Sequence, residues 1–106
     1  MKNIKYTQKQ QATLLCLISI AKDSHVDYET SPNRYTGGAF FTFETDRFGG
    51  CFLGLYIDKD GGITNTSTQK RMTLGDVKNA VPKLRDKLLQ HRDMAKVAEF
   101  INDQYD

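Results

Sequence analysis

Large hydrophobic side chains recur at every second position along residues 38–57, and this alternation predicts a β-hairpin. One set of alternate positions forms an apolar face that requires a core to cover it: Ala39, Phe41 and Phe43 in the first strand, and Cys51, Leu53, Leu55 and Ile57 in the second. The polar connection at 45–50 contains glycines suited to a turn. The intervening positions also carry aromatic rings, Phe40, Phe52 and Tyr56, so we expect the second face to contact something too.

A helical period of about 3.6 residues precedes the hairpin, over residues 7–23. The apolar arc of this helix is wider than a surface stripe, so we expect the helix to be covered on more than one side, by its own domain or by a second subunit. The arc consists of Leu14, Leu15, Leu17, Ile18, Ile20 and Ala21. This surface makes a homodimer possible.

The C-terminal part also has a helical pattern. Thr73 is a plausible N-cap for a second helix, with Asp76 at the capping-box distance. Pro82 predicts a kink there, or a short turn followed by a new helix. A last apolar stripe at 94–105 predicts a final helix, which is either separate from the second helix or continuous with it.

The remaining segments are polar. Residues 24–37 form a long connection, in which Tyr28 and Tyr35 either contact a partner or hold the loop against the body. Residues 58–62, DKDGG, indicate a turn, and residues 63–69 indicate a polar edge strand. The sequence therefore predicts a single α+β domain over residues 1–106, with a three-stranded antiparallel sheet and the order α-β-β-β-α-α.

Composition and charge exclude several classes. The 106 residues are 39% hydrophobic and 26% charged, as in globular proteins. A net charge of +2 and a pI of about 8.5 fall short of the concentrated basic surface typical of nucleic-acid-binding domains. The longest apolar run, residues 14–21, is too short to span a membrane, and no small-residue cleavage site for a secretory signal follows it.

The residues that carry catalysis or bind metals are sparse. His25 lies at the predicted exit of the first helix and His91 in a charged segment, so we expect both to be solvated polar residues rather than catalytic ones. The two cysteines, Cys16 and Cys51, lack metal-ligand spacing and sit in apolar segments, so we expect reduced, buried thiols in a cytoplasmic protein. The DKDGG segment lacks the later ligands of a calcium loop. We expect no enzyme activity, cofactor or metal.

Stoichiometric binding to another protein is the function that these features favour. Small domains of this kind include inhibitors and adaptors, such as phage-encoded inhibitors of bacterial defence complexes. Exposed aromatic rings beside a polar edge strand are typical of recognition surfaces. The candidate partner-binding residues are Phe40, Thr42, Phe52, Tyr56, Tyr35, Lys70 and Arg71.

Nucleic-acid binding is the alternative function. The three rings of the second face could stack on bases, and Lys70 and Arg71 could contact phosphates. Glu44 and Asp58 on the same face argue against this alternative, because both would repel a phosphate backbone.

Overall fold

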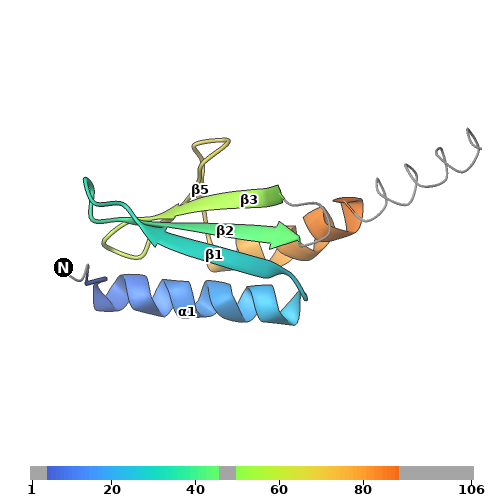
Figure 1. The fold of residues 1–106 in the computed structure, drawn as a ribbon, viewed down its shortest axis with the longest axis horizontal. Helices are drawn as coiled ribbons and strands as arrows, with labels where there is room; N and C mark the ends of the chain where they lie inside the picture. Colours follow the sequence, from blue (N-terminus) through green and yellow to red (C-terminus); the bar gives the residue numbers. More distant parts are fainter. Residues whose placement is uncertain (1–4, 46–49, 89–106) are drawn as a thin grey trace, which may run out of the picture.

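The protein is an α+β structure built on one antiparallel sheet. The computed structural model describes residues 5–45 and 50–88. Its elements are α1 (Gln8–Asp23), β1 (Asp27–Pro32), β2 (Ala39–Thr45), β3 (Gly50–Ile57), β4 (Ile63–Asn65) and β5 (Arg71–Met72), followed by a helix whose described part is residues 74–88. Each strand pairs antiparallel with the next, in the order β1-β2-β3-β4-β5. Figure 1 shows β1, β2 and β3 side by side.

The sheet has five strands rather than the three predicted. Residues 24–37 are not simply a loop, because β1 forms within them and pairs along its length with β2. All six residues of β1 are exposed, so no alternation of buried side chains marked it in the sequence. The predicted edge strand at 63–69 ends at Asn65, because the Asn65 side chain accepts hydrogen bonds from the backbone N–H groups of Ser67 and Thr68 and turns the chain. It is not an edge strand, since β4 pairs with both β3 and β5.

α1 begins and ends with local capping structures. Thr7 and Gln10 form a reciprocal capping box at its N-terminus. At its C-terminus, the N–H of Val26 donates to the carbonyl of Ala21 and the N–H of His25 donates to that of Lys22, which is a Schellman motif. His25 has a φ of 56° and occupies the left-handed position of this motif, so its visible role is structural.

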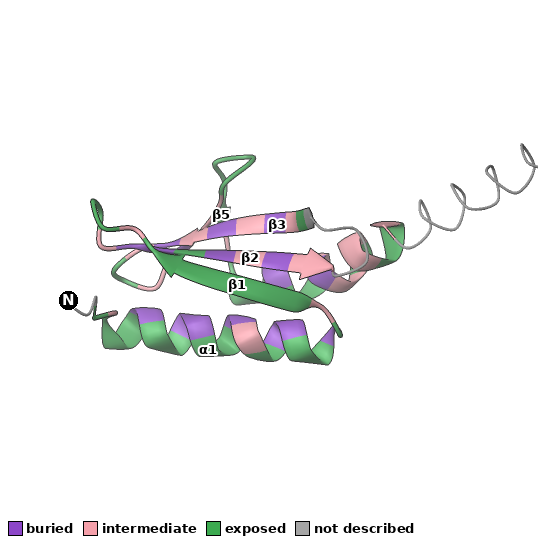
Figure 2. Ribbon diagram, viewed as in Figure 1, coloured by how far each residue is buried: buried purple, intermediate pink, exposed green. Residues whose placement is uncertain are grey.

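Within the described part of the chain, α1 is covered on one side only, whereas cover on more than one side was predicted. Its buried residues repeat at helical spacing on the side that faces the sheet: Gln10, Thr13, Leu14, Leu17, Ile20 and Ala21. Leu15 is 67% exposed, and Cys16 is also exposed. Figure 2 shows the buried positions of α1 on its side toward the sheet and exposed positions on the opposite side. The apolar arc overestimated the buried surface at Leu15. It also missed Gln10 and Thr13, which are buried through hydrogen bonds to the carbonyls of Gly37 and Gly61.

The second helix starts with the predicted capping box, in which Thr73 and Asp76 exchange hydrogen bonds. Pro82 does not end it, since residues 74–88 are helical without a break. Proline removes one backbone donor, but the buried side chains Val77 and Val81 hold this segment against the sheet. His91 and the predicted helix at 94–105 lie outside the described residues.

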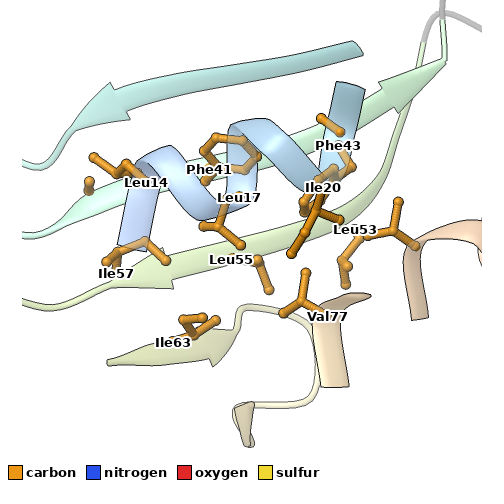
Figure 3. Packing of buried hydrophobic residues seen from close by; sticks show 13 residues of the cluster. Leu14, Leu17, Ile20, Phe41, Phe43, Leu53, Leu55, Ile57, Ile63 and Val77 are labelled. Atoms are coloured by element: carbon orange, nitrogen blue, oxygen red, sulfur yellow. The ribbon is translucent and has the colours of Figure 1, made fainter. Parts of the chain in front are cut away.

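Both helices contribute to one hydrophobic core on one face of the sheet (Figure 3). Leu14, Leu17 and Ile20 of α1 meet Phe41 and Phe43 of β2, while Val77 of the second helix lies near Leu53 and Leu55 of β3. The predicted core face of the hairpin is thus confirmed at all positions but Cys51. Within residues 5–45 and 50–88, no helix covers the opposite face of the sheet.

Candidate functional site

The face of the sheet opposite the helices is the candidate site, and we call it the open face. Strand register places Phe40 beside Tyr56, Thr42 beside Gly54, and Glu44 beside Cys51. Across β4 and β5, Tyr56 pairs with Thr64, which pairs with Arg71. Because directly paired residues share a face, these side chains form one surface. The prediction that Phe40, Thr42 and Tyr56 share a face is confirmed, and Arg71 joins them at β5.

Tyr56 is held in a fixed position on the open face. Its hydroxyl donates a hydrogen bond of 2.6 Å to Oγ1 of Thr36 in the β1–β2 connection. Its ring lies directly over Gly38, where an added Cβ would come within 2.2 Å of the hydroxyl oxygen. The edge of the Phe40 ring packs against it, with centroids 5.6 Å apart and planes at 63°. Tyr56 therefore loses little conformational freedom when a partner binds.

A β-bulge changes the expected positions of Phe52 and Cys51. The register shifts between Phe43 and Glu44, so that Leu53 pairs with Phe43 but Cys51 pairs with Glu44. Phe52 is the extra residue, and it packs against the core, with its ring 6.3 Å from that of Phe43. Cys51 is exposed instead of buried. The prediction that Phe52 lies on the second face is therefore wrong, because strict alternation fails at a bulge.

The other candidate residues occupy the margins. Tyr28 stacks on Phe41 with ring centroids 5.4 Å apart, so it holds β1 against the body of the protein. Tyr35 is 99% exposed in the β1–β2 connection, next to the Thr36 that anchors Tyr56. Lys70 is exposed and directly precedes Arg71. Thr36 and Gly38, which contact Tyr56, were not identified from the sequence. The only signal near them was the glycine pair beginning at Gly37.

One end of the open face carries an ion pair. Nη1 of Arg71 lies 2.9 Å from Oδ2 of Asp58, while Oδ1 of Asp58 accepts hydrogen bonds from the N–H groups of Asp60 and Gly62. Desolvation raises the pKa of Asp58, but the bonds from Gly62, Arg71 and Asp60 outweigh it and hold the pKa below its usual value. The turn predicted at 58–62 is confirmed.

Acid is expected to remove the stabilising effect of the Asp58 charge. Because its folded pKa is lowered, this contribution is fully present above the unfolded pKa of about 3.9 and is lost as pH falls through the folded pKa. Asp58→Asn should therefore be less stable than the wild type at pH 7, by at most ~1 kcal/mol for so exposed a pair. Urea unfolding at pH 7 and near pH 3 measures this difference, and a difference that is unchanged by acid would contradict the assignment.

The β1 side of the open face is acidic. Register places Glu29 beside Thr42 and Asp27 beside Glu44, on the same face as Phe40. The Thr42 hydroxyl donates to Glu44 Oε1 at 3.2 Å. Carboxylates around exposed rings repel a phosphate backbone and attract basic groups. Glu29 was not identified from the sequence, because its strand was assigned to a loop.

Cys51 lies on the open face, where its strand register places it beside Glu44. Partial desolvation of its sulfur raises the pKa of the Cys51 thiol. A backbone hydrogen bond with Leu53 lowers this pKa and the nearby Glu44 raises it, and the net rise disfavours the reactive thiolate form. Cys16 lies on α1, on the other side of the sheet from Cys51, and both thiols are free. Residues 5–45 and 50–88 contain no group of three potential metal ligands and no helix long and apolar enough to cross a membrane.

Comparison with protein-family models, with curated proteins and with solved structures found no match. The site is therefore interpreted from its own residues.

Proposed function

We propose that this protein acts without catalysis, by binding another protein stoichiometrically through the open face, as a small inhibitor or adaptor does. The observation that carries the proposal is the pair Phe40 and Tyr56, which stands on a face that neither described helix covers. Phe40 is 38% exposed, although its neighbours in the sequence, Ala39 and Phe41, are completely buried. Aromatic rings with limited freedom, surrounded by polar side chains, are the usual anchors of protein interfaces.

The proposed surface has a centre and a margin. Phe40, Tyr56 and the hydroxyl of Thr42 form the centre, and Tyr35, Lys70 and Arg71 extend the margin. Gly54 lies beside Thr42, and the Thr66 hydroxyl donates to its carbonyl, so Thr66 covers the sheet at this point. The charges at the β1 side favour a partner with basic groups, and they disfavour the nucleic-acid alternative. A cytoplasmic location accords with two exposed thiols that are not joined.

The test is the double variant Phe40→Ala/Tyr56→Ala. It should remain folded and lose its partner in a quantitative pull-down from the native host, followed by mass spectrometry. Hot-spot residues of this type each contribute about 2 kcal/mol or more, so the loss should exceed tenfold. The matched control is Leu15→Ala, which removes an exposed apolar side chain from the other side of the molecule.

Two results would contradict the proposal. The first is a folded double variant that retains its partner as well as the Leu15→Ala control does. The second is tight binding of a labelled oligonucleotide that weakens steeply with salt and is lost in the double variant.

A further inference from the structure

The outer edge of β1 is exposed and lies apart from the rings of the open face. β1 is the first strand of the sheet order and pairs only with β2 among the described strands. All six residues of β1 are exposed (Figure 2). The helix α1 lies beneath this part of the sheet but leaves β1 uncovered. An exposed edge strand has backbone donors and acceptors that can pair with another extended chain.

The direction of these backbone groups follows from the register. The N–H of Asn33 donates to the carbonyl of Gly38, a pair that continues the β1–β2 register. In an antiparallel ladder, hydrogen-bonded pairs alternate with non-hydrogen-bonded ones. Ser31 and Glu29 therefore bond toward β2, whereas the N–H and C=O groups of Tyr28 and Thr30 point outward. These two residues supply the hydrogen-bonding sites of the edge.

The residues of β1 disfavour pairing with a second copy of this chain. Two symmetric antiparallel registers would pair both Tyr28 and Thr30 with residues of the other β1. The register centred on residue 29 places Glu29 against its own copy in a close non-hydrogen-bonded pair, where like charges repel. The register centred on residue 30 pairs Tyr28 with Pro32, which has no N–H to donate.

A basic partner strand avoids both problems. Lysine or arginine at alternate positions would lie directly beside Glu29, on the face that also carries Glu44 one strand further in. The intervening side chains would lie on the other face, beside the exposed Tyr28 ring and Thr30. We propose that β1 extends its sheet by pairing with an extended segment of a partner protein that carries basic residues at every second position.

This inference adds a second contact to the proposed function, and it does not depend on the rings of the open face. The two can fail separately. If the open face is not a binding site, Phe40→Ala/Tyr56→Ala will not change partner capture, whereas strand addition at β1 can still be measured with a peptide.

The probe is a blocked peptide of alternating lysine and valine, titrated into the full-length protein. Its binding should slow hydrogen exchange of the Tyr28 and Thr30 amides, as measured by NMR. A blocked peptide of alternating glutamate and valine should bind at least about tenfold more weakly. Methylation of the lysine–valine peptide on the backbone nitrogens of one edge should abolish the protection.

Thr30→Pro and Thr30→Val form a matched pair of variants. Both remove the hydrogen bond from the Thr30 hydroxyl to the carbonyl of Phe40, but only proline removes the outward N–H. Proline at this position takes no donor from the β1–β2 ladder, so the variant should fold. Thr30→Pro should weaken peptide binding about fivefold or more relative to Thr30→Val.

Glu29→Lys provides an independent measurement, because it should reverse the preference between the two peptides whether or not Thr30→Pro folds. Equal binding of both peptides, or binding without protection of the Tyr28 and Thr30 amides, would overturn the proposal. The proposal would also be overturned if light scattering showed the wild type to be a dimer and its Tyr28 and Thr30 amides were protected without peptide. A second copy of the chain would then occupy the edge of β1.

Discussion

Phe41→Ala is expected to destabilise the protein by about 3–5 kcal/mol, whereas Phe40→Ala should cost only about 1 kcal/mol. Phe41 is completely buried, and its ring packs against those of Phe43 and Tyr28. Removing it leaves a cavity between the sheet and α1. Phe40 is the preceding residue on the other face, where truncation mainly removes an edge contact with Tyr56. Urea unfolding of both variants measures the difference.

This pair of neighbours tests the assignment of the two faces. Phe52→Ala serves as a third member, because the bulge places Phe52 against the core. Its cost should exceed that of Phe40→Ala. Equal costs for Phe40→Ala and Phe41→Ala would mean that both faces of the sheet are covered, and the open face would then be no candidate for partner binding.

Gln10→Glu is the second substitution with a large expected effect, a loss of about 3–5 kcal/mol at pH 7. The Gln10 side chain is completely buried. Its Nε2 donates to the carbonyl of Gly37 at 2.8 Å and lies 3.5 Å from the carbonyl oxygen of Ile57, while its Oε1 accepts from the N–H of Thr7. Glutamate would place a buried negative charge against two carbonyl oxygens.

The stability of Gln10→Glu should recover in part as pH falls, because a protonated carboxyl group regains one donor. Gln8→Glu is the matched control, since the same chemical change then occurs at an exposed position in the first turn of α1. There the new charge lies near the positive end of the helix dipole and should be neutral or slightly stabilising. A loss of similar size in both variants would refute the role assigned to Gln10.

The open face shows how far the sequence predicts the candidate site. Alternation along β2 correctly placed Phe40 and Thr42 together, because this strand is regular up to Phe43. On β3 the same reasoning succeeded for Tyr56, which lies in the regular part of the strand, and failed for Phe52, which is the extra residue at the bulge. A bulge depends on how two strands fit together, and no local residue pattern identified this one.

Supporting residues were harder to predict than the rings themselves. Thr36 and Gly38 fix Tyr56, but they lie in a segment that was interpreted only as a polar loop. Glu29 reaches the open face only because β1 pairs with β2. Each of these contacts joins residues distant in sequence, and no helical or alternating pattern marks them.

The sequence by itself determined the features that arise from local interactions. The start of the first helix near Thr7 was predicted from its helical period and that of the second from its capping residue Thr73, and the buried side of the hairpin followed from its alternation. These signals act within a few residues, so they can be recognised without a fold.

Only the tertiary structure decided which surfaces remain open. It placed both helices on one face of the sheet, formed β1 from a polar segment and exchanged the positions of Cys51 and Phe52 at the bulge. The physical reason is that an edge strand and a covering helix are specified by their partners across the sheet. Burial along a single segment does not reveal those partners.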